Sequence, residues 1–229
     1  RHGIVARGMW QRLWPAGQVD AVPIGHVTNG VHTTTWMAPA MQALLDRHLP
    51  ADWRARVADA DLWQRLRSVP DETLWATRRT LRRTLVELVR EKSAHDRLSR
   101  GEASDYVEAA ATTFDPDALT IGFARRVATY KRLHLLVRQL DWGLRLLADT
   151  RRPIQLVIAG KAHPSDDDAK RTLQALMGTR YHPGVGSRIA FLEDYDLHLA
   201  PLIVSGVDLW LNLPRPPLEA CGTSGMKVV

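Results

Sequence analysis

Apolar residues in the second half of the chain gather in four short, nearly continuous runs. These runs cover residues 119–124, 154–159, 188–192 and 207–211. Leucine-rich segments with the spacing of a helix lie between them, over residues 130–149, 165–177 and 196–204. Strands that are apolar throughout are typical of a parallel sheet covered by helices on both faces. The pattern therefore predicts a doubly wound α/β unit.

The first half of the chain has a helical rather than a strand-like pattern. Apolar residues at helical spacing predict a helix over 36–49, which Pro50 ends. A longer amphipathic helix is predicted over 71–98. Residues 100–117 are small, acidic and interrupted by proline, which indicates a connector. A helical segment is thus expected to precede the α/β unit.

The long predicted helix carries a row of arginines opposite its leucines. The row consists of Arg78, Arg79, Arg82, Arg83 and Arg90. Such a row fits either a solvated helix face or a stripe that binds nucleic acid. Few aromatic residues lie between these arginines, and this favours the solvated face. We therefore expect no nucleic-acid partner.

The composition is that of an ordinary globular protein, and it adds two points. Of the 229 residues, 45% are hydrophobic and 24% charged, and a single cysteine, Cys221, excludes an internal disulfide framework. No apolar stretch reaches the length of a membrane span, so no membrane partner is expected. The net charge of +6 comes mainly from arginine, and there are only five lysines: Lys92, Lys131, Lys161, Lys170 and Lys227. Lysine can form a Schiff base and arginine cannot, so these few positions merit inspection.

Polar residues of unusual type follow each predicted strand. Ligands of open parallel sheets bind beyond the carboxyl ends of the strands, which meet at one rim. The residues expected there are Arg125, Arg126 and Lys131 after the first strand, Gly160 and Lys161 after the second, Glu193, Asp194 and Tyr195 after the third, and Asn212 with residues 219–227 after the fourth. The sequence therefore predicts one site built from four strand ends.

Two parts of this predicted rim have the chemistry of a phosphate site. Arg125, Arg126 and Lys131 form a cationic cluster at the expected start of a helix, which would favour an anion. The alternative is a surface cluster paired with carboxylates. The small-residue loop 222–225 would let the backbone approach a phosphate closely, although it is equally compatible with a plain turn.

One segment of this loop resembles a known signature. EACGTSGMK, residues 219–227, is similar to the pyridoxal-phosphate attachment signature of the α-glucan phosphorylases. GFARRVATYKR, HVTNGVHTTTW, LVIAGKAHP and FLEDYDLHLA resemble further segments of that family, and the arrangement is closest to its shorter bacterial branch. The chain departs from many members at three positions: Arg125 replaces a lysine, Cys221 a serine and Gly225 an asparagine.

The resemblance implies roles for individual residues. Lys227 would carry pyridoxal 5′-phosphate on its amine, and the other cofactor contacts would come from Thr223, Gly222, Gly225, Arg125 and Tyr195. Arg126 and Lys131 would act catalytically by binding the substrate phosphate. Glu219, Asn29 and Gly222 would contact the terminal glucose. No metal is implied.

The resemblance also implies a fold and a reaction. The fold would be part of a two-Rossmann glycosyltransferase-B architecture, and the reaction a reversible phosphorolysis of α-glucan ends by inorganic phosphate to glucose 1-phosphate. Residues 1–30 would end an N-terminal domain and form the domain junction, 31–116 a helical connection, and 117–229 the first part of the C-terminal domain. A cytoplasmic location is implied, and a homo-oligomer is compatible with it.

Two other functions remain open on the sequence, and the chain ends lead to a separate expectation. A glycosyltransferase that uses a sugar nucleotide would share the fold without needing a lysine at 227, and a non-catalytic relative would bind glucan only. The chain begins with Arg1 and ends at Val229 in an unfinished helix, so we expect an internal piece of a longer protein. Such a piece is expected to be inactive and poorly soluble alone.

Overall fold

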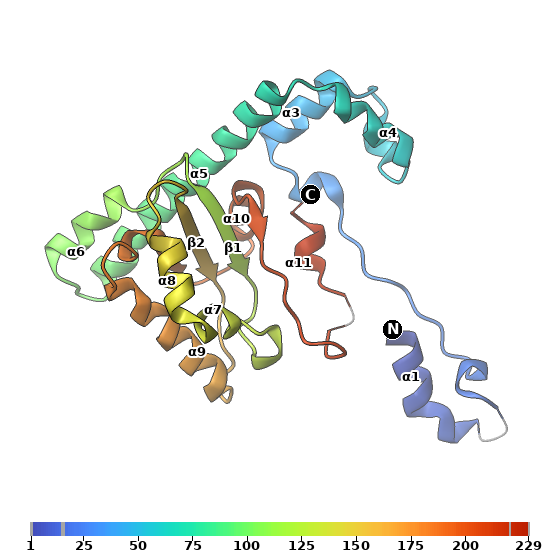
Figure 1. The fold of residues 1–229 in the computed structure, drawn as a ribbon. Helices are drawn as coiled ribbons and strands as arrows, with labels where there is room; N and C mark the ends of the chain where they lie inside the picture. Colours follow the sequence, from blue (N-terminus) through green and yellow to red (C-terminus); the bar gives the residue numbers. More distant parts are fainter. Residues whose placement is uncertain (1, 15–16, 220, 229) are drawn as a thin grey trace.

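A four-stranded, all-parallel sheet in the order β3-β2-β1-β4 forms the centre of the second half of the chain (Figure 1). The computed structural model describes residues 2–14, 17–219 and 221–228. The strands are β1 (Leu119–Ala124), β2 (Ile154–Ala159), β3 (Ile189–Leu192) and β4 (Leu209–Trp210). The predicted bounds of β1 and β2 are confirmed, β3 is one residue shorter, and β4 has only two of its five predicted residues. β4 lies at the edge of the sheet and pairs with β1 through Leu209 and Trp210.

Helices cover both faces of this sheet, as predicted for a doubly wound unit. On one face lie α5 (Asp71–Ser99) and α10 (Leu199–Gly206), and on the other α7 (Leu135–Arg138), α8 (Leu140–Ala148) and α9 (Asp167–Gly178) (Figure 1). Successive β2 residues alternate between the two faces, because side chains along a strand point to opposite sides. Val157 packs in the core cluster of α5 and α10, whereas Ile158 packs in the cluster under α7 to α9.

The arginines of α5 do not form the solvated face that their spacing predicted. Arg82 is 1% exposed, and its guanidinium donates to Asp208 at 2.9 Å and to the Pro116 carbonyl at 3.0 Å. Arg78 donates to the carbonyls of Ser205 and Val207 at the end of α10, at 2.7 and 2.6 Å. The prediction is therefore wrong for these two arginines, since Arg82 is buried and Arg78 is half-buried against the end of α10.

The other arginines of the row either contact the connector over residues 100–117 or face solvent. Arg90 donates to the carbonyls of Thr113 and Phe114 at 2.9 and 2.8 Å, so it too faces the protein. Arg79 is half exposed and pairs with Asp117 at 2.9 Å. Arg83 is exposed, and it best fits the solvated face.

The single helix expected over 130–149 is broken into pieces. A 3-10 turn, η6 (Thr129–Lys131), comes first, and Arg132 follows with a left-handed φ of 58°. Its guanidinium donates to the Leu213 carbonyl at 2.7 Å, and this tertiary contact accompanies the interruption. Lys131 consequently lies in a 3-10 turn and not in the first turn of a helix, which corrects the prediction.

A separate helical unit precedes the sheet. Its helices are α2 (Thr33–Trp36), α3 (Pro39–His48) and α4 (Ala60–Gln64), with short 3-10 turns at Trp53–Arg56 and Arg65–Ser68. Leu44, Leu45, Trp53 and Leu62 form its buried core. The helix expected over 36–49 begins at Pro39, because proline is favoured in the first turn of a helix. It ends before Pro50, as predicted.

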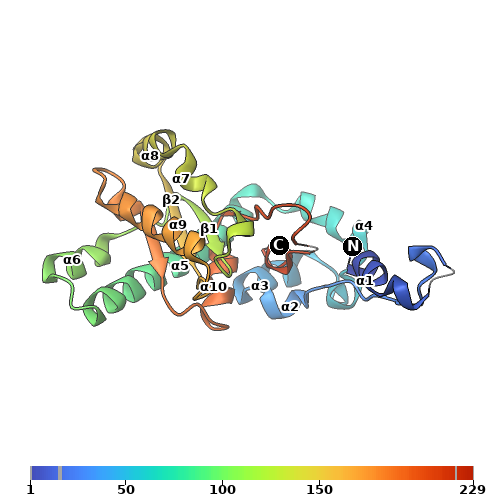
Figure 2. The same ribbon diagram turned by 90° about the horizontal axis from the view of Figure 1, so that it is seen from below.

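Short helices also occupy two regions outside these units. The predicted connector over 100–117 contains α6 (Ser104–Glu108) and the 3-10 turn η5 (Ala109–Thr112). Both lie at one end of the molecule, whereas α1 (His2–Trp10), with the turns Gln11–Leu13 and Val19–Ala21, lies at the other (Figure 2). None of the described helices is long and apolar enough to cross a membrane.

The contact of α5 with Asp208 gives a first prediction. Replacing Arg82 by methionine keeps the apolar stem but leaves the Asp208 carboxylate with less compensation in a mostly buried position. We expect Arg82→Met to lower the free energy of unfolding by about 3 kcal/mol, measured by urea denaturation. Arg83→Met, on the exposed side of the same helix, is the matched control. Equal stability of the two variants would contradict a role for the buried pair.

Candidate functional site

Three charged side chains meet at the carboxyl rim of the sheet. Arg125 directly follows β1 and donates to Asn212 Oδ1 and Glu219 Oε1, and Lys131 donates to Glu219 Oε2. The side chains of Arg125, Lys131 and Glu219 are at most 10% exposed. The ends of β1 and β4 and the loop after β4 therefore converge, as predicted. We call these four residues, Arg125, Lys131, Asn212 and Glu219, the Glu219 cluster.

A glycine at the end of β2 allows this arrangement. Gly160 has a φ of 137°, and a Cβ atom there would lie 2.1 Å from the Arg125 carbonyl oxygen. Any side chain would push the ends of β1 and β2 apart and displace Arg125. The Gly160-Lys161 segment continues beside the extension of β1, where the Val127 backbone N–H donates to the Lys161 carbonyl at 3.0 Å. Lys161 itself is exposed and pairs with Asp194 at 2.8 Å across the ends of β2 and β3.

The small-residue loop packs directly against the cluster. A Cβ atom on Gly222 would lie 2.9 Å from Glu219 Oε1, and one on Gly225 would lie 3.3 Å from Asn212 Nδ2. The loop then opens α11 (Thr223–Met226), as the sequence predicted. Small residues therefore bring the backbone at 222–225 next to the charged side chains.

The cluster retains positive charge after its internal pairing. Burial acts to raise the pKa of Glu219, but the hydrogen bond from Lys131 and the charge of Arg125 outweigh it and lower the pKa. One ionised carboxylate between two cations leaves one net positive charge, to which the exposed neighbour Arg126 adds a second. Of the alternatives posed by the sequence, pairing with a carboxylate is correct, but two of the cations are buried rather than on the surface.

Lys227 lies apart from this cluster, in a cavity of about 240 Å³ between α2, α3 and the end of α10. Its amine is 3.6 Å from the centre of the Trp36 ring. Burial lowers the pKa of Lys227, because partial removal from water disfavours the ammonium form. Within the described part of the chain Lys227 pairs with no carboxylate, whereas each of the other four lysines pairs with one.

Three further predicted site residues, Tyr195, Thr223 and Asn29, lie outside the Glu219 cluster. Tyr195 packs against the core cluster of α5 and α10, and burial raises its pKa. Thr223 begins α11, and its hydroxyl makes no hydrogen bond to the described residues. Asn29 is exposed on the extended segment before α2, and the structure does not bring it to the Glu219 cluster.

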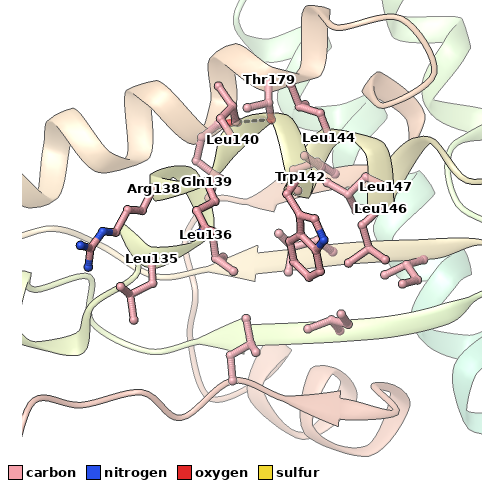
Figure 3. A pocket seen from close by; sticks show the side chains of 17 residues that line it. Leu135, Leu136, Arg138, Gln139, Leu140, Trp142, Leu144, Leu146, Leu147 and Thr179 are labelled. Carbon is pink, nitrogen blue, oxygen red and sulfur yellow. Dashed lines mark hydrogen bonds between the residues drawn. The ribbon is translucent and has the colours of Figure 1, made fainter.

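A mostly apolar cavity of the described chain lies elsewhere. It has a volume of about 410 Å³ and lies between the sheet and the helices α7 and α8 (Figure 3). Its walls are mostly leucine, and Trp142, 59% exposed, also lines it. None of the predicted site residues lines it, and its apolar walls offer little chemistry for a charged substrate.

Sequence reasoning missed two residues of this region. Asn212 was recognised at a strand end but given no role, although it accepts from Arg125 and lies beside both loop glycines. Trp36 was given no role in a site, although its ring faces the Lys227 amine. Its position after the sequence TNGVHTTT, next to a turn, is the signal that could have suggested a site.

Known proteins similar to this chain were identified by sequence comparison. No protein-family model matches. A glycogen phosphorylase of Mycobacterium tuberculosis is 49% identical over 226 residues, which is 99% of this chain and 26% of that protein. A glycogen phosphorylase of Aquifex aeolicus is 40% identical and a maltodextrin phosphorylase of Thermococcus litoralis 38% identical, each over 228 residues. The chain covers 32% and 27% of those two proteins, so it spans only about a quarter to a third of its relatives.

The Glu219 cluster gives a stability prediction. Within the described residues, Glu219→Gln removes the one carboxylate that pairs with Arg125 and Lys131, while it preserves the shape of the side chain. We expect the free energy of unfolding to fall by about 3 kcal/mol in urea denaturation. Glu108→Gln, an exposed carboxylate on α6, is the matched control and should change little. Unchanged stability of the Glu219 variant would show that the buried cations need no partner.

The same carboxylate predicts a pH dependence. Because the pKa of Glu219 is lower in the folded protein, its stabilising effect is complete above the ordinary carboxyl range and is lost as the pH falls through the lowered pKa. The stability difference between wild type and Glu219→Gln should therefore be largest above about pH 5 and shrink in more acidic solution. Denaturation series at several pH values measure it, and a difference that grew towards low pH would contradict the assignment.

Proposed function

Because the chain belongs to the α-glucan phosphorylase family, we propose that the full-length protein containing it catalyses reversible phosphorolysis of α-1,4-glucan ends, with pyridoxal 5′-phosphate as cofactor. By full-length protein we mean one in which this chain is flanked by the regions that its relatives have. The substrates would be the glucan and inorganic phosphate, and the product glucose 1-phosphate. A cytoplasmic location and the domain division at residues 30 and 116 belong to the same proposal.

The observation that carries the proposal is the state of Lys227. Among the five lysines it alone has no carboxylate partner in the described chain, and burial favours its neutral amine. A neutral amine is the form that reacts with a carbonyl group. The buried Ser224 hydroxyl, three residues before it, has no hydrogen-bond partner among the described residues and could bind a polar group of a cofactor. These residues fit pyridoxal phosphate.

In the proposed site Lys227 would hold the cofactor, with Thr223, Gly222, Gly225, Arg125 and Tyr195 as further contacts. Trp36 would pack beside it, since its ring already faces the Lys227 amine. When bound, the cofactor supplies a phosphate group that exchanges a proton with the substrate phosphate.

The Glu219 cluster would serve the substrate phosphate. Arg126 is exposed at the rim and free of ion pairs within the described chain, so it could meet an incoming phosphate first. Lys131 and Arg125 would then share their charge between Glu219 and the phosphate, which offsets the repulsion between two adjacent anions. Glu219, partly released, would accept a hydrogen bond from a glucose hydroxyl, and Gly222 would approach the sugar closely.

Asn29 enters the proposal only through the resemblance. Its exposed segment would have to approach the rim when the regions flanking this chain are present. This requirement agrees with the expectation that the chain alone is inactive, because it contains about a quarter to a third of the length of its relatives.

The decisive test is glucose 1-phosphate release from maltodextrin and phosphate by the full-length protein. Lys227→Ala should reduce the rate at least a thousandfold, because the cofactor loses its attachment. Lys170→Ala, an exposed lysine on α9 paired with Asp167, is the matched control and should retain full activity.

Two outcomes would contradict the proposed reaction, and a third would contradict the expectation that the chain alone is inactive. Activity that persists in Lys227→Arg and depends on a sugar nucleotide would point to a nucleotide-sugar glycosyltransferase. Retention on a glucan affinity gel without any phosphate-dependent product would point to a glucan-binding relative. Phosphorolysis by the isolated 229-residue chain would overturn the expectation that the flanking regions are needed.

A further inference from the structure

A turn and a loop lie against each other beside the Glu219 cluster. The turn covers residues 129–132, and the loop covers residues 213–219, between β4 and α11. The proposed function assigns roles to Lys131 of the turn and to Glu219 of the loop. Their ion pair would weaken when a substrate phosphate draws on the Lys131 charge. A contact that does not depend on this charge would then keep the loop in place.

Arg132 makes such a contact at the beginning of the loop. Its Nε atom donates to the Leu213 carbonyl at 2.7 Å, and a terminal nitrogen donates to the Pro214 carbonyl at 3.4 Å. The preceding residue, Lys131, reaches the other end of the loop at Glu219. A guanidinium carries several donors in one plane, so it suits two neighbouring carbonyl oxygens better than an ammonium group does.

A backbone hydrogen bond joins the turn to the middle of the same loop. The Arg215 N–H donates to the Tyr130 carbonyl at 2.8 Å. Three of the seven loop residues are prolines and have no N–H, so the loop can form few backbone hydrogen bonds of its own. Three consecutive residues of the turn thus contact the beginning, the middle and the end of a loop that depends on donors from its neighbours.

The backbone conformation of Arg132 is unusual for a residue with a side chain. Its φ of 58° lies in the left-handed region, which glycine adopts at no steric cost and arginine does not. An arginine at a position that favours glycine indicates that the side chain itself has a role.

The turn is also held from the side opposite the loop. The N–H and the hydroxyl of Thr129 donate to the two carboxylate oxygens of Asp166, at 3.1 and 2.8 Å. Asp166 caps the start of α9, and its side chain accepts from the Ala169 N–H there. The turn is therefore fixed to α9 whether or not the loop is attached to it.

We propose that Arg132 is a positioning residue of the candidate site: it holds the loop 213–219 on the turn, so that Glu219 keeps its place when Lys131 binds the substrate phosphate. Arg132 touches neither substrate, and it acts on Glu219 through the backbone of the loop. The part that concerns the substrates rests on the proposed phosphorylase function, whereas the attachment of the loop does not.

Hydrogen–deuterium exchange of the full-length protein tests the attachment of the loop. The Arg215 amide reports the contact with Tyr130 directly. Arg132→Gly suits the left-handed backbone and removes only the side chain, so we expect at least about tenfold faster exchange at Arg215. Arg132→Lys keeps the charge but loses the planar fork, and its exchange should be intermediate. Arg152→Gly, which removes an exposed arginine before β2, is the matched control and should exchange like the wild type.

The kinetics of the full-length protein test the effect on Glu219. In Arg132→Gly the turn stays fixed to Asp166, so Lys131 remains available to phosphate while Glu219 loses its fixed position. We expect the KM for maltodextrin to rise about tenfold, because a hydrogen bond to a charged group is weakened, and the KM for phosphate to change little. Arg132→Lys should recover part of the loss. Thermal melting verifies that each variant folds, and Arg132→Lys replaces Arg132→Gly if the latter does not.

Two results would overturn the proposal. Unchanged exchange at Arg215 in both Arg132 variants would show that the loop does not depend on this guanidinium group. Faster exchange with equal changes of the two KM values would give Arg132 a general structural role and refute the positioning of Glu219. A wild-type protein without phosphorolysis would refute the proposed function instead, and the exchange measurement would still decide whether Arg132 holds the loop.

Discussion

The carboxylate of Asp208 holds together the parts on which the rest of the structure depends. One oxygen accepts from Arg82 at 2.9 Å and from Arg78 at 3.4 Å, and the other accepts from the Thr120 backbone at 2.9 Å. It thereby joins α5 to β1 and to the start of β4. A two-residue strand at the edge of a sheet has few ladder hydrogen bonds, so this charge-assisted contact fixes where β4 and the loop after it begin.

The position of β4 in turn determines the candidate site. Asn212 follows β4 and accepts from Arg125, and the loop then brings Glu219 to both Arg125 and Lys131. The site is therefore built by joining distant segments through buried charge. Burying charged side chains costs free energy unless each charge is compensated. One positive charge of the cluster has no partner within it, so the cluster is suited to bind a second anion. In the phosphorylase proposal the substrate phosphate takes this place.

Buried arginines serve different ends within this one fold. Arg82 and Arg125 are each paired with a carboxylate, which stabilises the chain. Arg97 and Arg180 lack such partners in the described residues, and they stand beside an aromatic ring at the wall of a cavity. The contrast separates arginines that are paired with carboxylates from arginines that are held by uncharged acceptors, although all of them look alike in the sequence.

The sequence by itself determined the sheet, the long helix and the family. The bounds of β1, β2 and α5 followed from apolar periodicity, and the signature at 219–227 indicated the relatives that the comparisons then identified. The tertiary structure alone decided that Arg78, Arg82 and Arg90 are inside, that the helix expected over 130–149 is interrupted at Arg132, and that Trp36 faces Lys227. The periodicity of apolar residues indicates which face of a helix or strand is buried. It does not report which distant group will receive a hydrogen bond or a charge, because that partner is set by the packing of segments far apart in the chain.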